Sequence, residues 1–425
     1  PSPVASENKR PRTVAVPALI NRLLVVALLA CLGATPAPTS AAQTKAAAPP
    51  RTEVTPAPRR AWEFPADGVT FDSQFPAARA SECTRLGTDS YSVVTQPENR
   101  PINGSPWFAF RVRATTAKTI SIRIACSGTR LRYIPKISVD GARWVALPTE
   151  AFSPGPAADE GTIRVDVGPE PLRVAAQEII SGEVLEGWSR TLERLPFATR
   201  TEIGRSVGGR PLYLLEINAV PAGVKPGFVA VVSRQHPPET TGSQALMRFI
   251  ECVVADTPLA RDFRQKFAVL LVPLVNPDGV EAGHWRHNLN GVDTNRDWDA
   301  FAQPETRAVR DALLAARARG TMMLHLDFHS TFNDVFYTQT DEAPSTPAGF
   351  TKAWLDGISR RVPEYQVKRT PNSTPTQATS HHWAHRTFGI PAITYELGDN
   401  TDRVLLQSVA TAAADSMMEL LLATK

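Results

Sequence analysis

Residues 228–239 read FVAVVSRQHPPE, an apolar run followed by a polar turn. The run Phe228–Val232 has the length and the β-branched side chains of a buried strand. His236 and Glu239 lie three positions apart on the turn after it, and the prolines between them stiffen the backbone. The pair can therefore face one point just beyond the end of a strand. Alone, such an HxxE pair is a weak signal, because an ordinary surface loop contains it as readily.

Strands and helices alternate around this stretch. The expected strands are Leu212–Ile217, Phe228–Val232, Phe267–Val272, Met322–Phe328 and Ala392–Leu397, and the expected helices are Ser243–Val254, Pro304–Arg319, Thr346–Arg361 and about Arg403–Leu422. The alternation predicts an α/β fold in which a mixed sheet is flanked by helices on both faces. Sites in such sheets form in loops beyond the carboxyl ends of strands. All eight histidines of the chain lie in this part, from His236 onward.

The stretch before it has a different pattern. Short runs rich in β-branched or aromatic residues recur without a helical period at Trp107–Arg113, Thr119–Ser127, Trp144–Leu147 and Thr162–Val167. Asp140-Gly141 predicts a hairpin turn between two further runs. These signals predict a small all-β sandwich domain. It contains no histidine, and its residues indicate no chemistry of their own.

The ends of these patterns divide the chain into four parts. They are a signal peptide (1–42), an Ala/Pro-rich linker (43–61), the N-terminal β-sandwich domain (62–176) and the α/β domain (177–425). Basic residues before the apolar run Leu23–Leu29 and small residues after it are typical of a secretory signal. We therefore expect a periplasmic or secreted protein. The apolar run Leu23–Leu29 is too short for a stable membrane span. Cys31 also resembles a lipobox cysteine, so a lipid anchor there is the lesser alternative.

Charge and cysteines limit the partners. The formal net charge is +4, but residues 1–42 hold four basic residues against one acidic residue, so the rest is close to neutral. A nearly neutral body argues against an electrostatic nucleic-acid partner.

Cys83 and Cys126 would suit a disulfide in an exported protein. A buried thiol is an equal alternative, because Cys126 continues the inward alternation of the strand before it.

A third histidine gives the HxxE pair more weight. His329 follows the buried run Met323–Phe328, again where a strand meets a loop. Two histidines and one glutamate leave the fourth position of a tetrahedral zinc ion open, which is the catalytic rather than the structural arrangement. We therefore expect one Zn²⁺ ion at His236, Glu239 and His329.

Two further segments carry groups suited to hydrolysis. Asn295 and Arg296 place an amide beside a guanidinium, and this combination suits a carboxylate. Glu396 ends an apolar strand, where burial would raise the pKa of its carboxyl group toward general-base use. Each feature alone has an ordinary interpretation, such as a surface ion pair or a helix cap. Together, in this order, they favour a hydrolytic site.

The combined motifs from His236 to Asp399 resemble the M14 metallocarboxypeptidases, over about Glu178–Leu422. The segments Pro106–Val112 and Ser138–Gly141 resemble the β-rich domain that precedes the catalytic one in the cytosolic-carboxypeptidase-like subfamily. The resemblance implies a carboxypeptidase-like fold. It also implies a zinc-dependent exopeptidase that acts on peptide or protein C-termini.

The resemblance implies a role for each motif residue. The residues that match the zinc ligands are His236, Glu239 and His329. Glu396 matches the general base and acid, and Arg286 matches the arginine that stabilises the oxyanion. Asn295 and Arg296 match the pair that binds the C-terminal carboxylate of the substrate. Asp293 matches the partner of the first zinc-binding histidine, in keeping with the rule that metal-bound imidazoles are held by an acceptor.

The side-chain pocket of the family corresponds to about Ala378–Trp383. His381 falls about where deglutamylating members have an arginine, so a protonated His381 would favour an acidic C-terminal residue. A pocket-wall or surface histidine is an equal alternative. The sequence also departs from many pancreatic-type members at Pro238, where those have arginine.

Other functions fit parts of the sequence. A zinc amidase of the succinylglutamate desuccinylase/aspartoacylase type uses a similar HxxE…H set on N-acyl amino acids, although the β-rich domain and the context Thr394–Asp399 favour the peptidase. A cell-wall peptidase for γ-linked glutamyl peptides would suit an exported protein. A binding protein that has lost catalysis predicts a missing ligand or base, whereas all four residues are present.

Overall fold

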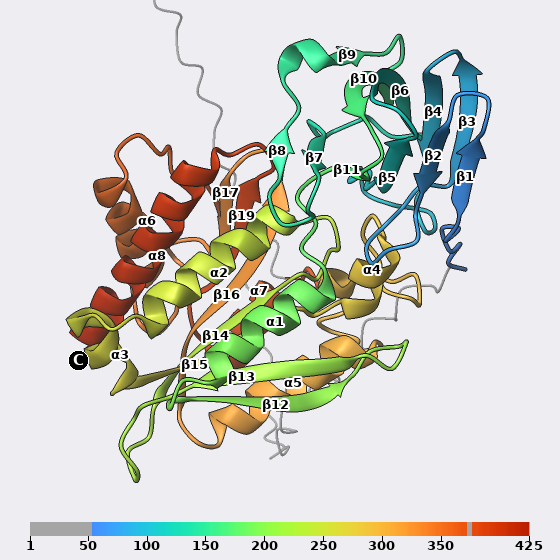
Figure 1. Ribbon diagram of the computed structural model, residues 1–425. Helices are drawn as coiled ribbons and strands as arrows, with labels where there is room; N and C mark the ends of the chain where they lie inside the picture. Colours follow the sequence, from blue (N-terminus) through green and yellow to red (C-terminus); the bar gives the residue numbers. More distant parts are fainter. Residues whose placement is uncertain (1–52, 372–375, 425) are drawn as a thin grey trace, which may run out of the picture. The chain divides into compact units, whose positions relative to one another are not determined.

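The computed structural model describes residues 53–371 and 376–424 (Figure 1). The predicted signal peptide (1–42), Cys31 within it and residues 43–52 of the predicted linker lie outside the described residues. The chain divides into two units, and every described residue belongs to the second, Lys45–Lys425.

The N-terminal part of this unit consists of two sheets. One has six strands in the order β1-β2-β5-β11-β7-β8 and the other has five in the order β3-β4-β6-β10-β9. Their bounds are β1 (Ala61–Phe64), β2 (Val69–Asp72), β3 (Glu82–Gly87), β4 (Ser90–Thr95), β5 (Ala109–Ala114), β6 (Lys118–Cys126), β7 (Lys136–Ser138), β8 (Val145–Ala146), β9 (Phe152–Pro154), β10 (Glu160–Val167) and β11 (Leu172–Ala175). The predicted all-β region is confirmed.

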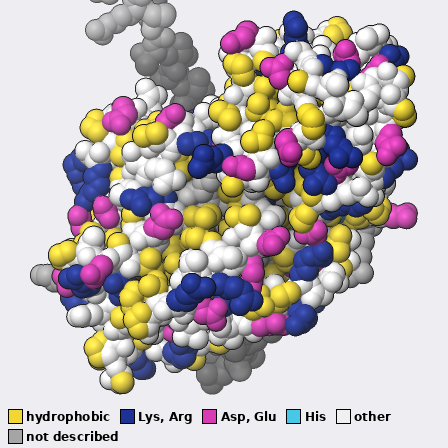
Figure 2. Space-filling view, in the orientation of Figure 1, with side chains coloured by type: hydrophobic (Ala, Val, Ile, Leu, Met, Phe, Trp, Pro, Cys, Tyr) yellow, Lys and Arg dark blue, Asp and Glu magenta, His cyan; other side chains and the backbone are white. Residues whose placement is uncertain are grey.

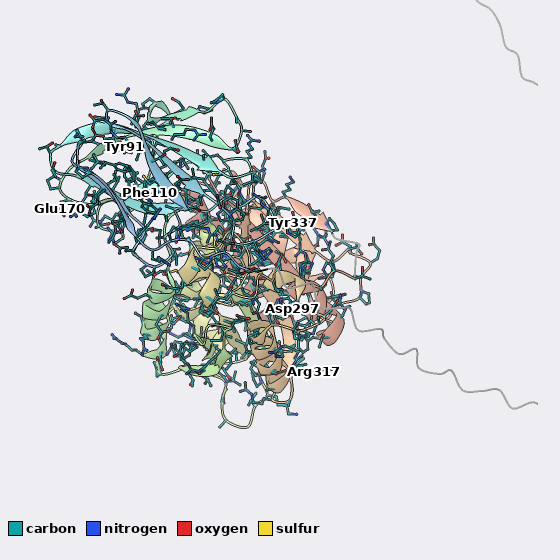
Figure 3. All side chains as sticks on the ribbon, turned by 90° about the vertical axis from the view of Figure 1, so that its right-hand side faces the viewer. Tyr91, Phe110, Glu170, Asp297, Arg317 and Tyr337 are labelled. Carbon is teal, nitrogen blue, oxygen red and sulfur yellow. The ribbon has the colours of Figure 1, made fainter. Side chains whose placement is uncertain are left out.

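The core of this region follows from strand alternation. Ile120, Ile122 and Ile124 of β6 are fully buried, while the residues between them are half-exposed. They pack with aromatic side chains such as Phe110 and Tyr91, both labelled in Figure 3. The cysteines in the described part of the chain are free and buried, so Cys83 and Cys126 form no disulfide.

The C-terminal part is built on a mixed eight-stranded sheet in the order β12-β13-β15-β14-β16-β19-β17-β18. The bounds are β12 (Ala198–Arg205), β13 (Pro211–Ile217), β14 (Gly227–Ser233), β15 (Phe267–Val272), β16 (Thr321–Thr331), β17 (Val335–Thr338), β18 (Arg369–Pro371) and β19 (Ala392–Gly398). The four middle strands β15, β14, β16 and β19 run parallel, and the strands beside them, β13 and β17, are antiparallel to their inner neighbours.

Helices cover both faces of this sheet, as predicted (Figure 1). They are α1 (Gly182–Glu193), α2 (Thr240–Val254), α3 (Pro258–Arg264), α4 (Pro277–Ala282), α5 (Pro304–Arg317), α6 (Phe350–Arg361), α7 (Ser380–Phe388) and α8 (Arg403–Ala423). Val229 and Val231 of β14 pack in the cluster that includes α2, α6 and α8. Phe228 and Ala230 pack in the opposite cluster with α5 and α7. Successive side chains of β14 point to opposite faces of the sheet, so the strand contributes to the hydrophobic cluster on each face.

Some elements differ from the predictions. Strand β16 continues to Thr331, so His329 lies within the strand rather than after it. Helix α6 begins at Phe350 rather than Thr346, because Gly349 caps it with a positive φ of 68°. Helix α7 and the outer strands β12, β17 and β18 were not predicted. Strands β17 and β18 have only four and three residues, and so short a run carries little periodicity.

Helix α8 is long and apolar enough to raise the question of a membrane span. Within the described residues it is the helix whose length and composition would allow a crossing, with a mean hydropathy of 1.2 over its most apolar window. Of that window, 56% is buried inside the protein, where Leu406, Val409 and Met417 join the core with α2 and α6. Its apolar residues are therefore explained by packing.

The predicted boundary between residues 176 and 177 falls in the segment between β11 and α1. Contacts cross between the two parts: Trp285, from the loop after α4, is fully buried among the side chains of the β-rich core. On the face seen in Figure 2, basic and acidic side chains are interspersed over both parts.

Candidate active site

Three of the predicted site residues converge at the carboxyl ends of neighbouring strands. His236 and Glu239 lie on the turn between β14 and α2, and His329 lies in β16, which pairs with β14. Oε1 of Glu239 lies 2.9 Å from Nδ1 of His236, and its Oε2 lies 2.7 Å from Nδ1 of His329. One potential ligand atom from each residue lies within 4.8 Å of the other two.

The turn that carries two of these ligands is fixed by side chains from elsewhere. The carbonyl oxygen of Gln235 accepts hydrogen bonds from Nδ2 of Asn276 at 3.2 Å and from Oγ1 of Thr294 at 3.0 Å. Arg234 adopts a positive φ of 55°, which turns the chain out of β14. The ligand turn is therefore held in shape by the surrounding protein.

Each imidazole is also held from behind by a carboxylate. Nε2 of His236 lies 2.9 Å from Oδ1 of Asp293, the partner that the sequence predicted. Nε2 of His329 lies 2.9 Å from Oδ2 of Asp327, which was not predicted. Both rings therefore present Nδ1 to the shared position beside Glu239, and the outer carboxylates fix that tautomer.

The donor chemistry of this group fits zinc. Two imidazole nitrogens and one carboxylate are the ligands of catalytic zinc sites, and acceptors behind the imidazoles complete the pattern. Burial works to raise the pKa of Glu239, but His236 and His329 outweigh it and hold that pKa well below its ordinary value. Glu239 is thus ionised, as a metal ligand must be. His236, Glu239 and His329 form a potential zinc-binding group.

Glu396 lies beside this group. Strand β19 runs parallel to β16 with Glu396 opposite His329, so both side chains point to the same face. Burial first, and then the charge of Glu239, raise the pKa of Glu396 to about 7. In the described part of the chain its Oε2 has no hydrogen-bond partner. The group is placed and tuned for proton transfer near neutral pH.

Both predicted arginines line the same cavity. Arg286 is buried, and its Nε donates to Oδ2 of Asp293 at 2.7 Å. Arg296 has an exposed side chain at the cavity, next to the buried Asn295. The amide oxygen of Asn295 already accepts a hydrogen bond from the backbone N–H of Ser380 at 2.9 Å. Nη1 of Arg296 donates to the backbone carbonyl oxygen of Asn295 at 2.8 Å, which holds the guanidinium beside Asn295 at the cavity.

His381 lies in α7 at the wall of the cavity. Its Nδ1 lies 2.8 Å from Oγ1 of Thr394, and its Nε2 has no partner among the described residues. Burial, aided by the nearby His382, holds the pKa of His381 well below its ordinary value of 6.5. A lowered pKa disfavours the protonated form that would select an acidic side chain, and the part of His381 in substrate choice stays a prediction.

The cavity has a volume of about 310 Å³, and the β-rich region contributes to its wall. Thr379 lies in the predicted pocket segment, and the wall residues that the sequence did not indicate are Asn103, Ser105, Arg132, Ser330, Thr331, Tyr337, Gln377 and Thr394. Arg132 donates from Nε to Oδ2 of Asp399 at 2.5 Å and from Nη1 to Oγ of Ser105 at 2.9 Å. Tyr337 of β17 is labelled in Figure 3. Asn103, Ser105 and Arg132 lie far from the motifs in the sequence, so no local pattern marks them.

A mixed α/β sheet that brings a His–Glu–His group and a separate carboxylate to one cavity defines the class of zinc-dependent hydrolases. The sequence profile of the zinc carboxypeptidase family, peptidase M14, matches residues 185–411. The chain belongs to this family.

Curated relatives carry a more specific name. Cytosolic carboxypeptidase 2 of Xenopus tropicalis is 35% identical over 144 residues, which are 31% of this chain and 15% of that protein. Cytosolic carboxypeptidase 6 of Caenorhabditis elegans is 21% identical over 338 residues, 73% of each chain. The matches to cytosolic carboxypeptidase 2 of Xenopus tropicalis and Danio rerio and to cytosolic carboxypeptidase 6 of Mus musculus span well under two thirds of the length of those proteins.

Solved structures show the same fold over most of the chain. A metallo-carboxypeptidase from Burkholderia cenocepacia has a TM-score of 0.72 at 19% identity and covers 83% of this chain and 99% of its own. A metallo-carboxypeptidase from Pseudomonas aeruginosa has a TM-score of 0.68, again at 19% identity, with 83% of this chain covered. The predicted carboxypeptidase-like fold with a β-rich region before it is confirmed.

The predicted location is wrong. A periplasmic or secreted protein was expected from the N-terminal residues, but the relatives are named cytosolic carboxypeptidases. A basic, apolar and small-residue order is a short compositional pattern. It lies in residues 1–42, outside those that the structure describes. With export contradicted, the reason for considering a cell-wall peptide as substrate is also lost.

Proposed function

We propose that this protein is a zinc-dependent carboxypeptidase that hydrolyses the last peptide bond of peptides or proteins. One observation carries the proposal: His236 and Glu239, which form a potential zinc-binding group with His329, line the same cavity as the carboxylate of Glu396. Membership of the zinc carboxypeptidase family supports it. A cytosolic substrate accords with the names of the relatives.

Zinc would be held by Nδ1 of His236, Nδ1 of His329 and the carboxylate of Glu239. When bound, the ion supplies a Lewis acid that polarises a carbonyl and makes water more acidic. Glu396 takes a proton from the attacking water and returns it to the leaving amine. Burial raises the pKa of Glu396 above its ordinary value, which favours a carboxyl group that can both take up and return a proton.

The arginines divide the remaining work. The guanidinium of Arg286 is fixed at Nε by Asp293, which leaves its terminal N–H groups free to stabilise the negative charge that develops on the scissile carbonyl oxygen. Arg296 binds the C-terminal carboxylate of the substrate, and this requirement makes the enzyme an exopeptidase. Asn295 lines the same side of the cavity.

A neutral His381 and the hydroxyl groups of Thr379 and Thr394 make this wall of the cavity polar and uncharged. We therefore expect no strong selection for an acidic C-terminal side chain. The preferred residue is best found by direct assay.

The proposal is tested with the zinc-loaded protein and a set of peptides that differ only in the last residue. Loss of mass equal to one C-terminal residue is the expected result, and a C-terminal amide should block it. Release of the acyl group from N-acyl amino acids, without release from peptides, would contradict the proposal and favour the zinc amidase. Each substrate is also run after zinc removal, because activity without metal would contradict the role of the His–Glu–His group.

A further inference from the structure

A buried carboxylate from the β-rich region accepts hydrogen bonds from the backbone of the loop that carries Arg286. Glu98, between β4 and β5, is fully buried. Its Oε2 accepts the backbone N–H of Trp285 at 2.7 Å, and its Oε1 accepts those of Arg286 at 2.9 Å and His287 at 2.7 Å. One side chain therefore binds three successive amides nearly 190 residues further along the chain.

Other contacts of the β-rich region hold the same loop on both sides. The fully buried Trp285 donates from Nε1 to the carbonyl oxygen of Trp107 at 2.9 Å. Nδ1 of His287 lies 2.6 Å from Oδ1 of Asn99, and Nδ2 of Asn99 donates to the carbonyl oxygen of Gly291 at 2.9 Å. The loop is thus attached firmly to the β-rich region.

The loop leads directly to the reacting groups. Arg286 donates to Oδ2 of Asp293, and Oδ1 of the same carboxylate holds Nε2 of His236. A shift of residues 285–287 would therefore move the guanidinium that faces the cavity. A displacement of about 1 Å at such a group can lower a rate by about a hundredfold.

A carboxylate suits this task in a way that an amide does not. Three N–H donors converge on the two oxygens of Glu98, and an ionised carboxylate offers only acceptors. Glutamine would present an N–H group to one of these donors and leave it unsatisfied in a dry site. Burial of a charged group is costly, so three charge-assisted bonds must offset it.

We propose that Glu98 is a positioning residue for the reaction, which acts through the backbone of residues 285–287 to hold Arg286 at the cavity. The β-rich region is then a working part of the active site and not only an appended domain. This inference rests on the proposed carboxypeptidase function for its kinetic consequence. The structural part, that Glu98 orders the loop, can be measured independently of activity.

The test compares wild type, Glu98→Gln, Arg286→Gln and the double variant, each as the full zinc-loaded chain with a peptide that wild type cleaves. Glu98→Gln should lower kcat about tenfold or more and change KM by less than about twofold. In the Arg286→Gln background it should lower kcat by less than about twofold, because the group it positions is already gone. Backbone hydrogen exchange should become faster in residues 285–293.

Glu178→Gln is the matched control. Glu178 is another partly buried carboxylate, and it binds Arg403 rather than the loop. The Glu178→Gln variant should leave kcat unchanged, and it should leave backbone hydrogen exchange in residues 285–293 unchanged. If Glu98→Gln does not fold, Asn99→Ala removes the neighbouring hydrogen bonds to the same loop and should give a smaller loss confined to kcat.

Three results would overturn the inference: equal losses of kcat with and without Arg286, an unchanged kcat, or unchanged exchange in residues 285–287. If wild type releases no residue from any peptide, the proposed function fails. The exchange measurement alone then decides whether Glu98 orders the loop.

Discussion

Each histidine of the candidate zinc group lies between two carboxylates. Glu239 meets Nδ1 of both rings, while Asp293 and Asp327 meet their Nε2 atoms. Asp327 also accepts a hydrogen bond from Nε2 of Gln235 at 2.6 Å and one from Oγ of Ser380. The outer carboxylates are therefore themselves fixed, and ring orientation is set before any metal binds.

We predict that Asp327→Asn weakens zinc binding by about 10–100-fold, because the amide can no longer hold Nε2 of His329 as a charged acceptor. Titration with a competing zinc chelator measures the change. Asp297→Asn is the control: Asp297, labelled in Figure 3, is equally buried but accepts bonds from Gln303 and Thr306. Equal zinc affinity in wild type and Asp327→Asn would contradict the assignment.

Glu396→Gln should keep zinc and lose turnover. The amide has the shape of the carboxylate but cannot accept the proton of the attacking water, and a general base contributes about 10²–10⁴-fold to a rate. We expect kcat to fall by that order with zinc content unchanged, measured by peptide hydrolysis and metal analysis. His329→Ala is the opposite case, since it should lose zinc. Full activity of Glu396→Gln would exclude it as the base.

The site residues that the sequence predicted are those whose spacing is local or whose motif is specific. His236 and Glu239 are three residues apart, and His329 and Glu396 end apolar runs. Asp327 had a usable signal, because residues two apart in a strand share a face. Glu98 and Arg132 had none, since they reach their partners across about 190 and 267 residues.

Among the elements, three neighbouring strands build the site. Strands β14, β16 and β19 are parallel and adjacent, so their carboxyl ends deliver the ligand turn, His329 and Glu396 to one edge. Long apolar runs predicted these strands. The order of the strands, the antiparallel outer strands and helix α7 could not be predicted, because pairing across the sheet depends on tertiary contacts.

Helix α2 follows the ligand turn and packs on β16 through a glycine. A Cβ added at Gly242 would lie 2.6 Å from the carbonyl oxygen of His329 and 2.8 Å from its carbonyl carbon. Both atoms are backbone, so the helix or the strand would have to move. Gly242 therefore sets how closely Glu239, at the start of α2, approaches His329.

We predict that Gly242→Ala lowers the free energy of unfolding by about 1–3 kcal/mol, the usual effect of overpacking a core. Zinc affinity should fall as well, because α2 carries Glu239 away from His329. Gly187→Ala is the control: Gly187 is exposed in α1 with nothing within 4 Å of an added Cβ, and alanine there should stabilise the helix by about 0.5–1 kcal/mol. Chemical denaturation and zinc titration distinguish the two variants, and an unchanged Gly242→Ala would contradict the packing argument.

At the scale of the whole molecule, the β-rich and α/β parts are joined by buried charged groups. Besides the bonds of Glu98 to residues 285–287, the buried Arg132 pairs with Asp399. Such groups are costly to bury unless each is satisfied, so they favour one arrangement of the two parts over others. The predicted division after residue 176 stays a prediction, because these contacts cross it.

The hydrogen bonds between Glu98 and residues 285–287 also make the free energy of unfolding depend on pH, with a known sign. Burial works to raise the pKa of Glu98, but nearby His284 and Arg79 and the backbone N–H groups of His287 and Trp285 outweigh it and hold the pKa below its ordinary value of 4.5. Between the folded and the unfolded pKa of Glu98, the unfolded chain binds more protons than the folded chain, so the free energy of unfolding rises with pH. The contribution is full above the unfolded pKa and is lost as pH falls through the folded value.

We therefore predict that Glu98→Gln lowers the free energy of unfolding by about 1–3 kcal/mol at pH 7, the usual effect of leaving a buried donor unsatisfied. The difference from wild type should stay constant down to about pH 5 and shrink below about pH 4.5, because a protonated Glu98 presents the same kind of donor as glutamine. Urea unfolding of both proteins across this range measures it. Asp256→Asn, in an exposed pair with Arg261, should show little difference at any pH. A difference for Glu98→Gln that persists undiminished at the acid end would mean that the charge of Glu98 does not bind the loop.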